Sequence, residues 1–138
     1  FAVRSDMTQF ATVLCGLYTI ADHTLRWARA GHPPPVLVDG GGARVLELPG
    51  HTPIGIISDP LVLADVETTL EPSSLLVIYT DAMLARRGEI IGVGFGRLQE
   101  AAASLAVHPG PICRRLRTLV GTTTAEDDIC LLTIRRDA

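Results

Sequence analysis

The spacing of apolar residues changes once along this chain, near residue 80, and this change limits the folds that it can adopt. Upstream, short apolar runs rich in β-branched residues alternate with turn-forming residues, a pattern typical of β-strands. Downstream, apolar residues recur at helical spacing in two segments that begin near Arg97 and Ile112, with Pro111 at the start of the second. A last apolar run, Ile129–Ile134, predicts a closing strand.

Six strands are expected ahead of the helices. Residues 11–21 are apolar almost throughout, which predicts a buried strand, and residues 24–30 predict a half-exposed strand paired with it. Three glycines after Asp39 lie between two apolar runs and predict a hairpin. The six predicted strands cover residues 11–21, 24–30, 36–38, 45–48, 61–70 and 75–79. This order predicts an α+β fold, a layered sandwich of mostly antiparallel β-sheets flanked by helices.

Composition limits the functional classes. The chain has 138 residues, 47% hydrophobic and 20% charged, which suits one globular domain over residues 1–138. A net charge of −3 without a basic run argues against a nucleic-acid partner or an anionic membrane surface, and the short apolar runs predict no membrane span. Cys15, Cys113 and Cys130 are too scattered for a disulfide framework, so we expect buried, small hydrophobic side chains in a reducing cytoplasm.

Acidic residues flank the two most apolar strands of the second half. Asp81 follows residues 75–79, and the acidic run 126–128 precedes the closing strand. If these strands are antiparallel neighbours, the carboxylates share one sheet edge; if they are parallel, the carboxylates lie about 20 Å apart at about 3.3 Å per residue. Crowded carboxylates repel one another unless a cation neutralises them, and oxygen ligands favour Mg²⁺ or Mn²⁺. Solvated acids or turn formers are the alternative interpretation.

Three other features invite a functional interpretation. The glycine-rich segment 92–96 lacks the lysine of a phosphate-binding loop, so we interpret it as a flap ahead of the helix near Arg97. Arg86 and Arg87 either attract an anionic phosphoprotein or lie on a solvated helix face. His32, in a proline-rich bend, is expected to close that turn by hydrogen bonding and not to act as a general acid.

Six short motifs occur in the order and spacing of one protein family. They are Phe10–Val13, Ala30–Pro35, Pro53–Ile56, Leu75–Ala82, Phe95–Leu98 and Asp127–Ile129. Together they extend over nearly the whole chain, which resembles the SpoIIE/RsbU-like branch of the PPM (protein phosphatase 2C-like) metal-dependent serine/threonine phosphatases. The resemblance implies the fold predicted above, with the N-terminal part of the complete domain absent from this chain.

The resemblance also implies a site and a reaction. Asp81 and Asp127 correspond to metal ligands of the family, and Asp128 is a further candidate at a position where other branches often have Asn. Two Mn²⁺ or Mg²⁺ ions in the complete domain would support hydrolysis of phosphoserine or phosphothreonine on a protein partner. An anti-sigma factor antagonist is the partner that the family commonly uses. A homodimer and a sensor domain linked to the parent protein are further partners that we consider.

Two departures from the family pattern keep an alternative open. Ala82 stands where the family has Gly after the acid, and a position that requires positive φ would strain an alanine. The family's first acidic motif lies upstream of the matched region, and Asp6 does not replace it. We therefore expect little turnover and weak metal binding from this chain alone. The alternative function is a catalytically degenerate binding or regulatory module.

Overall fold

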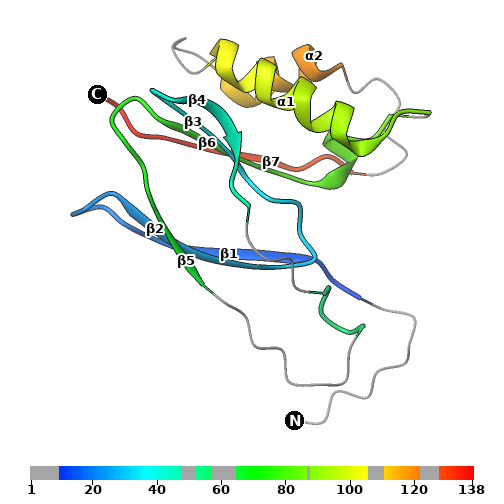
Figure 1. The fold of residues 1–138 in the computed structure, drawn as a ribbon, viewed down its shortest axis with the longest axis horizontal. Coiled ribbons are helices and arrows are strands. Elements are labelled where there is room, and N and C mark those ends of the chain that lie inside the picture. The colour runs from blue at the N-terminus through cyan, green and yellow to red at the C-terminus, as the bar shows by residue number, and fades with distance from the viewer. Residues whose placement is uncertain (1–9, 48–51, 57–64, 87, 106–110, 122–127) are drawn as a thin grey trace. The chain divides into compact units, whose positions relative to one another are not determined.

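The computed structural model describes residues 10–47, 52–56, 65–86, 88–105, 111–121 and 128–138. Its elements follow the predicted order of six strands, two helices and a closing strand (Figure 1). They are β1 (Val13–Thr19), β2 (Thr24–Ala30), β3 (Val36–Asp39), β4 (Gly42–Val45), β5 (Val66–Thr69), β6 (Leu75–Tyr79), the 3₁₀ turn η1 (Asp81–Met83), α1 (Ile91–Leu105), α2 (Ile112–Val120) and β7 (Leu131–Arg135). All pairings between these strands are antiparallel, so the predicted α+β class of antiparallel sheets with helices is confirmed.

The elements divide into two compact units. The first, formed by residues 1–32 and 48–69, contains the sheet β1-β2-β5. The second, formed by residues 33–47 and 70–138, contains the sheet β4-β3-β6-β7 and both helices. Every described residue of the predicted metal site belongs to the second unit.

In the first unit, the prediction of a buried strand over residues 11–21 is wrong in its burial. β1 is shorter, and its side chains are largely exposed, Leu17 by 69%. Among the described strands, β1 pairs only with β2, so one of its edges has no strand partner. Cys15 is exposed on this strand and Cys130 is exposed elsewhere, so the expected burial of the cysteines fails for both. Apolar composition alone did not distinguish an edge strand from a central one.

β2 is the central strand of that first sheet, and its side chains are mostly buried or half-buried, so it is less exposed than the half-exposed strand predicted for residues 24–30. Trp27 is 2% exposed, and its indole Nε1 donates to the Thr68 hydroxyl of β5 at 3.0 Å. Residues 61–64 of the predicted fifth strand lie outside the described residues. The predicted pairing of β2 with β1 is confirmed over seven residue pairs.

In the second unit, the hairpin predicted around the glycines is present, but its second strand lies closer to the turn. β4 begins at Gly42, which has a φ of 102°, and pairs with β3 from Asp39↔Gly42 to Val36↔Val45. The strand predicted over residues 45–48 therefore starts three residues early, because the glycine at positive φ closes the turn sooner than apolar content indicates.

Both helices lie over one face of the four-stranded sheet and enclose the core of this unit (Figure 1). The core consists of Val36, Val38, Leu75, Val77, Tyr79, Met83, Leu84, Leu98, Ala101, Ala102, Leu105, Leu116 and Val120. The central strand β6 supplies alternate residues to it. Because β6 is packed into the core along its length, the backbone of the residues that follow it, Thr80 and Asp81, begins from a fixed position.

The glycine-rich segment 92–96 is not a flap, and this prediction is wrong. α1 begins at Ile91 and includes these residues in its first turns. Gly94 explains the difference: a Cβ there would lie 2.4 Å from the carbonyl oxygen of Leu84. The helix packs against that backbone as only glycine allows, and this tertiary contact outweighs the low helix propensity of glycine.

Candidate metal centre

The pairing of β6 with β7 decides where the acidic residues lie. Five residue pairs, from Leu75↔Arg135 to Tyr79↔Leu131, make the two strands antiparallel neighbours. The end of β6 and the beginning of β7 therefore share one sheet edge. Asp81, shortly after β6, and Asp128, shortly before β7, both lie at that edge. Of the two strand arrangements that the sequence left open, the antiparallel one is present. The parallel arrangement, which would separate the Asp81 and Asp128 carboxylates by about the length of a strand, is excluded.

Thr80 extends the ladder by one step and locks this edge. Its amide donates to the Cys130 carbonyl at 3.1 Å. Its hydroxyl donates to the Asp128 carbonyl at 3.1 Å and accepts from the Cys130 amide at 2.9 Å. The side chain thus replaces a further backbone pair and holds the approach to β7 against β6. Sequence reasoning missed Thr80, and its position directly before the candidate acid was the available signal.

Asp81 opens the 3₁₀ turn, and its backbone is held firmly. Its carbonyl accepts from the amides of Leu84 at 2.8 Å and Ala85 at 3.1 Å, while its side-chain Oδ1 accepts from the Ala82 amide at 2.9 Å. The residue itself is exposed. A rigid backbone with a solvent-facing carboxylate is an arrangement that suits a ligand for an external cation. We call η1 together with Leu84 the Asp81 turn.

Ala82, which replaces the glycine of the family pattern, fits this turn without strain. Among the described non-glycine residues, positive φ occurs at His23 and Ser73, and Ala82 is not one of them. Its side chain is 6% exposed and lies within the 3₁₀ turn. The expected strain at this position is therefore absent.

The described part of the chain supplies two carboxylates at this edge. Asp128 is exposed, whereas Asp127 lies outside the described residues, so its predicted role stays a prediction. Within the described residues, no group of three or more His, Cys, Asp or Glu side chains is close enough together to bind a metal ion. Two carboxylates at one edge are oxygen donors of the kind that a hard divalent cation prefers, so Asp81 and Asp128 are candidate ligands.

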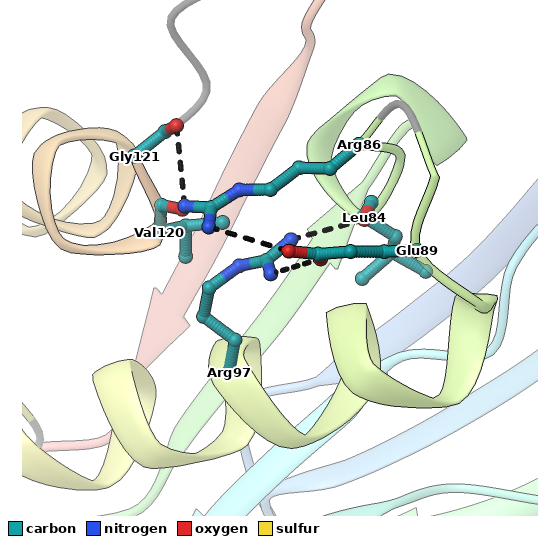
Figure 2. Close-up of polar contacts among 6 residues, drawn as sticks. All are labelled: Leu84, Arg86, Glu89, Arg97, Val120 and Gly121. Atoms are coloured by element: carbon teal, nitrogen blue, oxygen red, sulfur yellow. Dashed lines mark hydrogen bonds and ion pairs between the residues drawn. The ribbon is translucent and has the colours of Figure 1, made fainter.

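Arg86, after the Asp81 turn, binds the end of α2. Its Nη2 donates to the Val120 carbonyl and, at 3.2 Å, to the Gly121 carbonyl, where Gly121 ends the helix at a φ of 68° (Figure 2). These are carbonyls that a helix leaves without intrahelical partners. Arg86 is therefore a helix cap and does not lie on a solvated helix face, while its attraction of an anionic phosphoprotein stays a prediction. Arg87 lies outside the described residues.

Glu89 joins Arg86 to Arg97 of α1, and we call these three residues the arginine cluster (Figure 2). Glu89 Oε2 accepts from Arg97 Nη1 at 2.6 Å, and its Oε1 lies 3.7 Å from Arg86 Nη1. The hydrogen bond from Arg97 is the main cause that lowers the pKa of Glu89, and the charges of both arginines lower it further against an opposing effect of desolvation. Arg97 Nη2 donates to the Leu84 carbonyl at 3.1 Å. The cluster thus connects both helices to the Asp81 turn.

Comparison with protein-family models identifies the family of this chain. The family described as Stage II sporulation protein E (SpoIIE) matches residues 2–137. The chain belongs to the SpoIIE family. The resemblance noted from the six sequence motifs is therefore confirmed, and the PP2C-like phosphatase fold that it implied is the fold of this SpoIIE-family chain.

Solved structures agree with this assignment. The RsbU and RsbW domains of Rv1364c from Mycobacterium tuberculosis match 91% of this chain and 37% of that chain, with 26% identity and a TM-score of 0.77. The SiaA-PP2C domain of Pseudomonas aeruginosa matches 95% of this chain and 54% of that chain, with 21% identity and a TM-score of 0.70. The phosphatase domain of SpoIIE from Bacillus subtilis matches 91% and 56%, with 15% identity and a TM-score of 0.65. The last two establish the fold alone.

The SpoIIE-family chain spans 37% to 56% of the length of these solved chains. Within its described residues, no helix combines the length and the apolar character that crossing a membrane requires.

Proposed function

We propose that this chain contributes one edge of the metal site of a phosphoprotein phosphatase, and that Asp81, Asp127 and Asp128 are its ligands there. The observation that carries the proposal is the antiparallel pairing of β6 with β7, which brings Asp81 and Asp128 to the same sheet edge. Membership of the SpoIIE family supports the phosphatase reaction.

The chemistry of the edge favours a hard cation. Carboxylates at one edge repel each other, and a divalent cation relieves that repulsion. No described arginine pairs with Asp81, whose Oδ1 accepts only the Ala82 amide in this part of the structure. Oxygen ligands favour Mn²⁺ or Mg²⁺ over zinc, and the SpoIIE phosphatase domain was solved after presoaking with Mn. Such ions, when bound, neutralise phosphoryl charge and lower the pKa of bound water.

The chain's own residues have two tasks in this proposal. The Asp81 turn holds the backbone of Asp81 in a fixed position at the end of β6, because the amides of Leu84 and Ala85 donate to the Asp81 carbonyl. Thr80 holds the backbone of Asp128 and Cys130 at the same edge, so the backbone segments that carry the two acids are tied together. Fixed spacing matters, since reacting groups lose rate steeply when displaced by about 1 Å.

We further propose that the substrate is a phosphoserine or phosphothreonine of a regulatory protein. The solved relatives include RsbU and SpoIIE domains. An anti-sigma factor antagonist is the partner that the family resemblance implies. Three free cysteines accord with a reducing compartment such as the cytoplasm. A dimer and a linked sensor domain are further elements of this proposal.

A second function, a binding module without turnover, has one observation in its favour. The described residues hold two carboxylates at the edge and no larger group of metal-binding side chains. Such a domain would bind a phosphoprotein or a second copy of itself. Hydrolysis of a phosphorylated substrate distinguishes the two functions, because only the phosphatase carries it out.

The first experiment measures metal binding by this chain. Mn²⁺ is titrated into the wild type, Asp81→Asn, Asp128→Asn and Glu71→Gln, with thermal unfolding and calorimetry as readouts. Glu71 is an exposed carboxylate at the opposite end of β6 and is the matched control. We expect weak binding that raises the melting temperature of the wild type and Glu71→Gln but not of Asp81→Asn, because a ligand that binds only the folded state stabilises it.

The second experiment measures hydrolysis by the full-length protein. p-Nitrophenyl phosphate and a phosphoserine peptide are tested with Mn²⁺, in the wild type and in Asp81→Ala. Loss of activity in Asp81→Ala supports the phosphatase. Equal activity and equal Mn²⁺ binding in both proteins would remove Asp81 from the site, and metal binding without turnover in the wild type would favour the module.

A further inference from the structure

We propose that Arg97 is a positioning residue for the candidate metal centre, because its guanidinium fixes the Asp81 turn to α1. This inference rests on the proposed function for its effect on metal, while its structural part is tested independently. Arg97 lies 16 residues after Asp81, and its side chain is 16% exposed.

The contact falls on the backbone that ends the Asp81 turn. Arg97 Nη2 donates to the Leu84 carbonyl at 3.1 Å. Leu84 is 1% exposed, so its carbonyl has little access to water and needs a protein donor. The amide of the same residue donates to the Asp81 carbonyl at 2.8 Å. One residue thus links the guanidinium of Arg97 to the backbone of the candidate ligand.

Two neighbours set the position of Arg97. Glu89 accepts from Nη1 at 2.6 Å and so holds the other arm of the planar guanidinium. Gly94, one turn earlier on α1, lies so close to Leu84 that a Cβ would be 2.4 Å from the carbonyl oxygen. The Leu84 carbonyl therefore packs against the helix backbone and accepts a hydrogen bond from the helix side chain at once. The Asp81 turn cannot move relative to α1 without losing both contacts.

The physical consequence concerns the ligand and not the reacting atoms. A metal ligand binds best when its carboxylate is held in place before the ion arrives. Changes to the direct hydrogen-bonding partners of metal ligands commonly reduce affinity by about 10- to 100-fold, and Arg97, which acts through the Leu84 backbone, is expected at the lower end of that range. Lysine cannot replace Arg97 fully, because an ammonium group lacks the two-armed geometry that spans a carbonyl and a carboxylate.

The test uses Arg97→Leu and Arg97→Lys, with two controls. Arg114→Leu removes an exposed arginine of α2 outside the cluster. Arg86→Leu removes the cap of α2 and the 3.7 Å contact with Glu89 but keeps the hydrogen bond from Arg97 to the Leu84 carbonyl, and so provides a destabilised chain in which that bond remains. All variants are measured at a temperature where circular dichroism shows that they are folded.

The first readout is hydrogen exchange of the Leu84 and Ala85 amides, which donate to the Asp81 carbonyl. We divide the exchange rates of these two amides by those of amides in the β6–β7 ladder, which corrects for changes in overall stability. The resulting ratio should be at least tenfold higher in Arg97→Leu than in the wild type, intermediate in Arg97→Lys, and equal to the wild-type ratio in both controls. The second readout is the Kd for Mn²⁺, which we expect to rise about tenfold in Arg97→Leu and to stay within twofold in the controls.

Unchanged exchange at Leu84 and Ala85 in Arg97→Leu overturns the inference. Unchanged Mn²⁺ affinity in that variant also overturns it, provided that Asp81→Asn abolishes binding. If Asp81→Asn itself binds Mn²⁺ like the wild type, the proposed function fails, and the exchange readout still decides whether Arg97 holds the turn.

Discussion

The hydroxyl of Thr80 donates to the carbonyl of Asp128 at 3.1 Å and so joins two segments that are 48 residues apart in the sequence. The same oxygen accepts from the Cys130 amide at 2.9 Å. One side chain therefore sets the spacing between the end of β6 and the approach to β7, where the two described acids of the candidate site lie.

Replacing Thr80 by Val keeps its shape and removes both hydroxyl bonds. Each neutral hydrogen bond is worth about 0.5–1.5 kcal/mol, so we expect Thr80→Val to lose about 1–3 kcal/mol of unfolding free energy in urea titrations. Thr80→Ser retains the hydroxyl and should lose less than half as much. Hydrogen exchange of the Cys130 amide should accelerate in the Val variant alone, and equal stability of Val and Ser variants would contradict the role of the hydroxyl.

Gly94 and Gly96 lie in the same helix but have different surroundings. A Cβ at position 94 meets the Leu84 carbonyl, whereas at position 96 it meets nothing within 4 Å. We expect Gly94→Ala to destabilise the protein by about 1–3 kcal/mol through overpacking. Gly96→Ala should stabilise it by about 0.5–1 kcal/mol, because alanine favours a helix. Chemical unfolding measures both, and the same sign for the two variants would refute the packing of α1 on the Asp81 turn.

The arginine cluster makes part of the stability dependent on pH. The pKa of Glu89 is lowered below its ordinary value of 4.5, first by the hydrogen bond from Arg97. Its stabilising contribution is therefore complete at pH values above 4.5 and disappears as the pH falls through the lowered pKa of the folded state. We expect Glu89→Gln to be less stable than the wild type at pH 7, with a difference that shrinks toward pH 3.

Thermal unfolding across this pH range checks the Glu89 prediction. Glu100→Gln, on an exposed part of α1 outside the cluster, is the control and should differ from the wild type by a constant small amount. A Glu89→Gln difference that grows as the pH falls would have the wrong sign for a salt-bridged carboxylate.

The three thiols should differ in reactivity. Cys15 and Cys130 are exposed, whereas Cys113 is half-buried, with its sulfur 3.5 Å from the Thr133 hydroxyl. Labelling with Ellman's reagent should therefore give two fast equivalents and one slow equivalent that becomes fast in urea. Cys15→Ser and Cys130→Ser should each remove one fast equivalent, and a slow Cys15 would show that β1 is covered in solution.

The sequence predicted the fold closely where local signals and tertiary packing agree. Leu75–Tyr79 was predicted with its observed bounds, because the run is apolar and followed directly by polar residues. The second helix, which starts after Pro111, was predicted for the same kind of reason. Both are cases in which the residues at the boundary carry the information.

The mistakes arose where a distant contact decides the local structure. The glycine-rich start of α1 is helical because Gly94 packs on Leu84, ten residues earlier, and single-sequence periodicity does not contain that contact. β1 is largely exposed although its sequence is apolar, and its composition does not reveal that it has one partner strand among the described residues.

For the candidate site, the sequence supplied the acids but not what holds them. Asp81 and the acidic run 126–128 were named from their positions beside apolar strands, and the common edge of Asp81 and Asp128 followed once the strand direction was known. Thr80, Arg97 and Glu89 were not assigned roles, because their partners are backbone carbonyls or side chains far away in the sequence. Every residue has a backbone carbonyl, so the identity of a residue does not indicate that its carbonyl accepts a hydrogen bond from a distant side chain.

The alanine after the acid has a consequence for how relatives are recognised. The backbone at Ala82 lies in an ordinary right-handed turn that any small residue can occupy. A pattern that demands glycine directly after this acid would discard chains like this one for a requirement that the geometry does not impose. Surveys of the family should instead weigh the threonine before the acid and the glycine and arginine of the following helix.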